Sequence, residues 1–208
     1  MAFPDFYAAA PVIHTHDGLA ELLGAADGGL MDYHYVDAVK LCGHSCPTVA
    51  SAWLAAHAAL TALFPGGPAE RGGVTVRMPA PRDAGTTGVM AQVMTLATGA
   101  AAENGFPGLG GSHQRKGLLS YAGEPGDDAI VVARVDNGMS TAVSIDPSGV
   151  EAAPEMAGLF ARVRSGAADA SARAVFGRLW QDRVRRLLTE HFDDPAVVRI
   201  KLLEPIRE

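Results

Sequence analysis

The longest apolar stretch of the chain follows Pro47 and predicts a helix that is buried on most of its sides. The run TVASAWLAAHAALTALF continues to Phe64 without a charged residue, and a helix with so little polar surface belongs in a core. Pro47 suits the first helical turn, because its missing N–H would have no helical partner there. A second apolar helix is expected over TGVMAQVMTLATGAA, with Thr86 or Thr87 as its cap and its end near Ala101.

Alternation of apolar and polar positions, together with β-branched residues, predicts the strands. The turn Asp136-Asn137-Gly138 separates two of them and indicates a hairpin. The segment 31–41, MDYHYVDAVKL, is compatible with either a strand or a helix. The predicted strands cover residues 73–78, 118–122, 129–135, 139–145 and 196–204.

Amphipathic patterns predict further helices near both ends of the chain. A short helix is expected after Asp17, which would cap it, and Gly28-Gly29 would end it. Another short helix is expected over 154–165. The pattern of 170–192, ASARAVFGRLWQDRVRRLLTEHF, predicts a long amphipathic helix.

This order of elements indicates the α+β class, with one mixed or antiparallel sheet packed against two buried helices and a long C-terminal amphipathic helix. We expect a single domain over residues 1–208. Its core would lie at about 31–150, with the C-terminal helix and strand over 154–204. The chain length is sufficient for one such core.

Composition and charge narrow the classes of partner. The chain is 48% hydrophobic and 19% charged, which is ordinary for a globular protein. A net charge of −6 disfavours nucleic acid as a partner. No apolar run reaches the roughly 18 residues of a membrane span, and the first residues lack a signal-peptide pattern. We therefore expect a cytoplasmic protein that contacts neither nucleic acid nor membrane.

Both cysteines flank one histidine in LCGHSCPT, residues 41–48. If this segment is extended, Cys42, His44 and Cys46 share one face, and two thiols with an imidazole suit zinc or a similar divalent metal. Cys46 also lies at the mouth of the apolar helix, where the helix dipole stabilises a thiolate. Three other interpretations stay open: a reversible disulfide, a cysteine nucleophile with His44 as its base, and buried thiols without chemistry.

The stretch GHSCPTVASAWLAAHAAL resembles the signature of the FmdE family, which is named after a component of formylmethanofuran dehydrogenase and in which a G-H-x-C-P element opens an alanine-rich helix. The likeness continues through GVTVRMPAPRDAGTTGVMAQVMTLATGAAAENG to HQRKGLLSY, so that it covers about residues 40–122. It implies an α+β domain, often a homodimer, with a metal bound by His44 and Cys46. Cys42 stands where the family commonly has another histidine.

The chain departs from the FmdE pattern at three places. The family's loop cysteine would fall near 85–87, and the cysteine of its T-G-C turn would fall at Ala100. Many members also carry a C-terminal zinc ribbon with paired C-x-x-C motifs, which a chain with two cysteines lacks. These departures argue against electron transfer or a ribbon-linked role, and nothing in the residues supports formylmethanofuran chemistry.

Other histidines are candidates for completing a metal shell. His14 and His16 share a face if their segment is extended, and His34 lies between two tyrosines. Each also has a plainer interpretation, as part of an exposed terminal turn or as a partly buried, hydrogen-bonded ring. His57, within the apolar helix, is expected in the core.

A glycine-rich loop, ENGFPGLGGSHQRKG, offers candidates for catalysis and ligand binding. His113 could act as an acid or base, and Arg115 and Lys116 could bind an anionic ligand when the loop closes. The alternative is an ordinary solvated loop. Asp83 and Thr86, in the preceding loop, could line the same pocket or simply cap a helix.

Three functional hypotheses follow from these residues. The first is a metal-dependent protein with zinc or another divalent metal and an open position for a small-molecule ligand or substrate. The second is a non-catalytic metal or small-molecule binding module, such as a sensor, with a closed shell. The third is a thiol redox protein that uses Cys42 and Cys46. The residues do not decide whether the protein is an enzyme.

Overall fold

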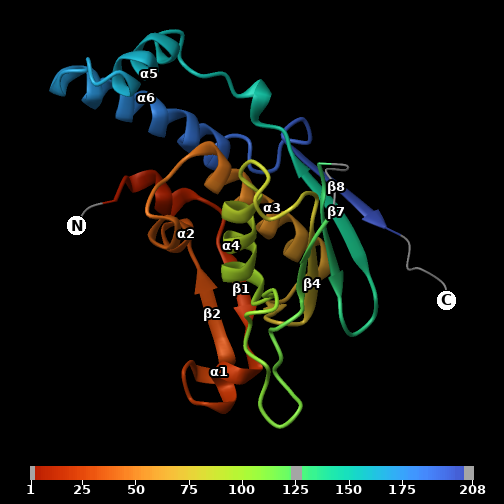
Figure 1. The fold of residues 1–208 in the computed structure, drawn as a ribbon. Coiled ribbons are helices and arrows are strands. Elements are labelled where there is room, and N and C mark those ends of the chain that lie inside the picture. The colour runs from red at the N-terminus through yellow and green to blue at the C-terminus, as the bar shows by residue number, and fades with distance from the viewer. Residues whose placement is uncertain (1–2, 123–127, 204–208) are drawn as a thin grey trace.

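A five-stranded sheet and a three-stranded sheet share one core around a central helix (Figure 1). The computed structural model describes residues 3–122 and 128–203. The large sheet has the order β5-β4-β6-β7-β8, with β4 and β5 parallel and the other pairs antiparallel. Its strands are β4 (Val74–Met78), β5 (Leu119–Tyr121), β6 (Ile130–Arg134), β7 (Ser140–Ile145) and β8 (Val198–Leu203). The prediction of the α+β class with a mixed sheet is confirmed.

The small sheet is a feature that the hydrophobic pattern did not predict. It has the order β2-β1-β3, with strands β1 (Ile13–His16), β2 (Leu30–Tyr33) and β3 (Ala69–Glu70). β3 consists of two residues that follow the turn after the apolar helix, which is too short for an alternation signal. The ambiguous segment 31–41 divides between β2 and helix α2 (Tyr35–Cys42).

Helix α3 (Pro47–Leu63) is the centre of the core, as its apolar sequence predicts. It packs against the large sheet, against α4 (Thr87–Thr98) and against α6 (Ala170–Thr189). Trp53 and Leu54 are fully buried, and the Trp53 indole N–H donates to the Pro11 carbonyl at 2.9 Å. Both predicted apolar helices therefore exist: α3 is buried along most of its length, whereas α4 buries one face and leaves Gln92 exposed on the other.

Helix α4 begins at Thr87 as predicted but ends earlier than predicted. Thr86 occupies the cap position, but its side chain makes no capping hydrogen bond. The helix ends at Thr98 rather than near Ala101, because Gly99 turns into the left-handed conformation and donates to the Thr95 carbonyl.

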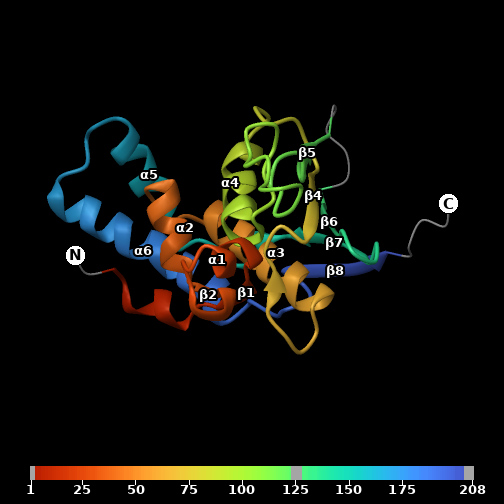
Figure 2. The ribbon, with the colours of Figure 1, turned by 90° about the horizontal axis from the view of Figure 1, so that it is seen from below.

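The C-terminal helices project from the rest of the molecule, as the view from below shows (Figure 2). α5 (Met156–Arg164) packs against α6, whose second half reaches the core through Val184, Leu187 and Leu188. Short helical segments complete the fold: α1 (Gly18–Leu22), η1 (Asp5–Ala9), η2 (Asp27–Gly29) and η3 (Pro147–Gly149). Asp17 caps α1 as predicted, by accepting from the Leu19 and Ala20 N–H groups. None of the helices in the described ranges is long and apolar enough to cross a bilayer.

Truncating the central helix tests this core. We expect Leu54→Ala to lower the free energy of unfolding by about 2–5 kcal/mol, because it removes fully buried apolar atoms and leaves a cavity. Leu22→Ala, at a position that is 60% exposed, is the control, and its effect should stay within about 0.5 kcal/mol. Urea denaturation measures both values. Equal effects would contradict the central place of α3.

Candidate functional site

The cysteine–histidine segment forms the tight turn between α2 and α3. α2 continues to Cys42, and Gly43 ends it in the left-handed conformation (φ 73°), with its N–H donated to the Val39 carbonyl. Cys46 caps α3, and its sulfur accepts from the Val49 N–H at 3.5 Å. The premise that Cys42, His44 and Cys46 alternate along an extended segment is therefore wrong, because the amphipathic pattern of α2 carries the helix through Cys42.

His44 is exposed and is held at one ring nitrogen. Its Nδ1 lies 2.9 Å from the Cys42 carbonyl oxygen, so a proton on Nδ1 is donated to that oxygen. This leaves Nε2 directed away from the backbone bond. Metal-ligating histidines are commonly oriented by such a bond from the other ring nitrogen to a backbone carbonyl.

Polar side chains from α2 and α6 hold the turn between α2 and α3 by hydrogen bonds to Ser45. The Tyr35 hydroxyl is fully buried and lies 2.9 Å from the Ser45 Oγ. The side chains of Trp180 and Gln181, on α6, each donate to the Ser45 carbonyl at 3.1 Å. The C-terminal helix therefore helps to hold the turn between the two cysteines.

The two thiols act on each other electrostatically. Burial raises the pKa of Cys42, and the negative charge of a Cys46 thiolate raises it further. Burial also raises the pKa of Tyr35, with smaller contributions from both cysteines, so that its hydroxyl stays protonated. Both cysteines are free thiols. Ionisation of Cys46 therefore disfavours ionisation of Cys42, and as they stand Cys42, His44 and Cys46 are not placed to hold a metal ion together.

The remaining predicted metal ligands have other partners. His14 pairs with Asp32 across the small sheet (Nδ1 to Oδ1, 2.6 Å), and His16 pairs with Glu70 at 2.5 Å. His34 begins α2 and Cys42 ends it, so about 12 Å of helix separates them. Within residues 3–122 and 128–203, no group of three or more His, Cys, Asp or Glu side chains is placed to hold a metal ion.

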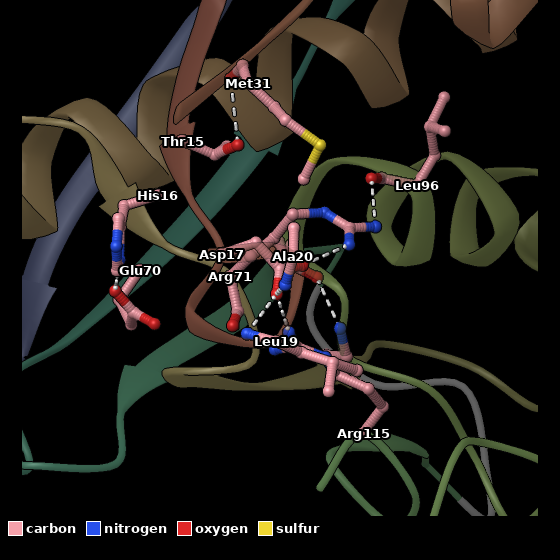
Figure 3. A network of polar contacts seen from close by, with 12 residues as sticks. Thr15, His16, Asp17, Leu19, Ala20, Met31, Glu70, Arg71, Leu96 and Arg115 are labelled. Atoms are coloured by element: carbon pink, nitrogen blue, oxygen red, sulfur yellow. Dashed lines mark hydrogen bonds and ion pairs between the residues drawn. The ribbon is translucent and has the colours of Figure 1, made fainter. Parts of the chain in front are cut away.

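A second polar centre lies at the end of β1 and was missed in the sequence (Figure 3). The buried Asp17 carboxylate accepts from Arg71 Nη1 at 2.9 Å and from Arg115 Nη2 at 2.6 Å, besides the two helix N–H groups that it caps. Arg115 Nη1 also donates to the Arg71 carbonyl. We call Asp17, Arg71 and Arg115 the Asp17 centre. The sequence signals only the helix cap, because its two arginines are 54 and 98 residues away.

The electrostatics of the Asp17 centre favour the charged carboxylate. Burial alone would raise the pKa of Asp17, but the hydrogen bond from Arg71 and the charge of Arg115 together lower it below its usual range. Burial lowers the pKa of Arg115, and the Asp17 charge opposes that shift. The prediction that Arg115 reaches from a flexible loop to a ligand needs correction, because its side chain is 10% exposed and bound to Asp17.

The glycine-rich loop is anchored by Arg115 rather than free to close. His113 is half-buried and has a left-handed backbone (φ 59°), and its imidazole lies against Gly18. A Cβ on Gly18 would lie 3.2 Å from His113 Cε1, so the glycine makes room for the ring. Lys116 is exposed beside it, and Asp83 and Thr86 are also exposed.

Two cavities open near these residues. One of about 430 Å³ is lined by His14 and His57; burial, and then the charge of His14, lower the pKa of His57. The other, of about 590 Å³, is lined by Leu41, Arg71 and Arg82 among others. Leu41 directly precedes Cys42 in the sequence. Asp83 and Thr86 do not line this larger cavity, whereas their neighbours Arg82 and Gly88 do.

Neither models of known protein families nor the curated protein sequences gave a match to this chain. The resemblance to the FmdE family therefore stays a prediction, and the site is argued below from its own geometry.

Replacing the carboxylate of the Asp17 centre tests its structural role. We expect Asp17→Asn to lower the free energy of unfolding by about 3 kcal/mol, because it leaves two guanidinium groups without their counter-charge, while asparagine still caps α1. Asp27→Asn, at an exposed position, should change it by less than about 0.5 kcal/mol. Chemical denaturation at pH 7 measures both, and equal effects would contradict the role of the centre.

The lowered pKa of Asp17 predicts how the stability difference between wild type and Asp17→Asn depends on pH. The folded-state pKa of Asp17 is lowered, so its stabilisation is complete above the unfolded value of about 3.9 and is lost as the pH falls through the folded value. The stability difference between wild type and Asp17→Asn should therefore be constant from about pH 5 to 8 and shrink below about pH 4. A difference that grows on acidification would show that the carboxylate is not stabilised by its charge.

Proposed function

We propose that the turn between α2 and α3 binds a divalent metal ion, zinc in the first place, and presents it to a small-molecule ligand. The observation that carries this proposal is the pair of free thiols at the two ends of the turn, Cys42 at the end of α2 and Cys46 at the start of α3, with the charge of Cys46 acting on Cys42. Thiolate and imidazole are the ligands that zinc prefers, and this turn carries two cysteine thiols and one histidine imidazole.

The electrostatics of the pair favour a metal over redox chemistry. A thiol with a raised pKa is a poor nucleophile at neutral pH, which counts against the disulfide and nucleophile interpretations for Cys42. Burial of Cys42 and the charge of Cys46 both disfavour a Cys42 thiolate. A divalent cation bound by both sulfur atoms would offset both effects, because it displaces the proton and compensates the repulsion between thiolates. The Cys46 sulfur accepts a hydrogen bond from the Val49 N–H at the start of α3, which restrains its position.

His44 is the third ligand in this proposal. Its ring is exposed, and a bond from Nδ1 to the Cys42 carbonyl would hold the tautomer that leaves Nε2 for the metal. Three protein ligands leave a fourth position of a tetrahedral ion for water or a small ligand, which is the pattern of reactive zinc sites. The rigid support of Ser45 by α6 limits the movement to the side chains.

Metal titration of the reduced, metal-free protein tests this site. With Co²⁺ as a spectroscopic substitute for zinc, we expect one ion per chain and the absorption typical of thiolate–cobalt bonds. Cys42→Ser and Cys46→Ser should abolish that absorption, and His44→Ala should weaken binding by about tenfold or more, because each removes one ligand. His191→Ala, a histidine outside the turn, is the matched control and should bind like wild type.

The affinity should rise with pH, since binding displaces protons from the thiols. Intact folded protein that binds neither Co²⁺ nor Zn²⁺ would contradict the proposal. Formation of a Cys42–Cys46 disulfide under mild oxidation in such a protein would instead support the thiol redox alternative. A site with four protein ligands would support the non-catalytic binding module.

A further inference from the structure

The larger of these two cavities is lined by none of the proposed metal ligands and has a distinct chemistry. It has a volume of about 590 Å³ and is enclosed by one side of α4, the segment 101–104 and β5, with Leu41 of α2 at its border. This volume lies in the range of small-molecule sites. Apolar atoms of Ala91 and Leu96 line it together with the polar side chains of Gln92, Thr95 and Asn104.

At its inner end the cavity is lined by Arg71, whose side chain is 18% exposed, against 62% for Arg82. Arg71 belongs to the Asp17 centre, whose cluster is balanced: Arg71, Arg115 and His16 lie with Asp17, Glu70 and Glu21. The described residues that line the cavity itself include two guanidinium groups, of Arg71 and Arg82, and one carboxylate, of Glu103. A low-dielectric cavity with such a lining attracts anions.

Arg71 is held in place with hydrogen-bond donors to spare. Its Nη1 donates to Asp17 and its Nη2 to the Leu96 carbonyl, both at 2.9 Å, and its guanidinium lies over the Tyr33 ring. These bonds use two of the five N–H groups of the guanidinium. Within the described part of the chain, Nε is buried without a hydrogen-bond partner. The rigid placement reduces the entropy cost of binding a ligand here.

A second arginine lies at the rim of the cavity. Arg82 pairs with Glu103 at 3.0 Å and lies over the Tyr121 ring, but both charged side chains are more than 60% exposed. A pair this exposed contributes little stability, so an incoming anion can replace Glu103 as the partner of Arg82. Among the described residues that line the cavity, Glu103 is the only acid.

We propose that this cavity binds a small organic anion, with its carboxylate or phosphate group attracted by Arg71 at the inner end and contacted by Arg82 at the rim. The apolar wall of α4 accommodates the carbon skeleton of the ligand, and Gln92 and Asn104 can bond its polar groups. This inference does not rest on the metal site, whose proposed ligands do not line the cavity.

Isothermal titration of metal-free protein with succinate, inorganic phosphate and the neutral succinamide tests the proposal. We expect succinate or phosphate to bind at about millimolar concentration or below, more weakly at high salt, and succinamide not to bind. Binding of succinate alone identifies a carboxylate ligand, and binding of phosphate alone identifies a phosphorylated one. The metal-free state keeps this result separate from any failure of the metal site.

Two variants locate the binding without disturbing the Asp17 centre. Arg82→Gln removes the rim charge, and Gln92→Glu places a negative charge in the wall; both residues are exposed. Each should weaken binding of the anion by roughly tenfold, the scale of one charge-assisted hydrogen bond. Arg178→Gln, an equal loss of charge on exposed α6, should leave it unchanged. The proposal would be overturned if neither succinate nor phosphate binds, or if an anion binds and neither variant weakens its binding.

Discussion

The buried carboxylate of Asp17 is the interaction on which the arrangement of the polar segments depends. A charge that is 6% exposed is tolerated only when it is fully paired, and Asp17 is paired by two arginines and two helix N–H groups. Those partners come from the start of α1, the turn before β4 and the glycine-rich loop. One carboxylate therefore fixes three segments that have little apolar surface with which to pack.

Burial of the central helix α3 fixes the position of the turn that carries the cysteines. Because α3 is buried along most of its length, its N-terminus is fixed in position, and so is the cap residue Cys46. Ser45 is bound by α6 through its carbonyl and by Tyr35 through its hydroxyl. The proposed metal site thus stands on a rigid support, and His44 is itself restrained by the Cys42 carbonyl. Such support favours a preorganised set of ligands.

The two proposed sites favour ligands of opposite charge. A cation would stabilise the thiolate forms of Cys42 and Cys46, whereas the described lining of the cavity has two arginines and one acid. Leu41 borders the cavity and precedes Cys42 in the sequence, but none of residues 42–46 lines it, so each site is argued and tested by itself.

Local patterns in the sequence determined most of the elements and little of their assembly. The apolar run after Pro47, the alternation in β4 to β7 and the cap at Asp17 depend on neighbours within a few residues, so they can be recognised from the sequence. The small sheet and the Asp17 centre depend on residues up to 98 positions apart, which meet only because α3 brings the chain back. The expected alternation of Cys42, His44 and Cys46 fails for a local reason, because α2 continues to Cys42, Gly43 ends it and Cys46 caps α3. Only the tertiary structure decided that Trp180 and Gln181, more than 130 residues away, would hold the turn between them.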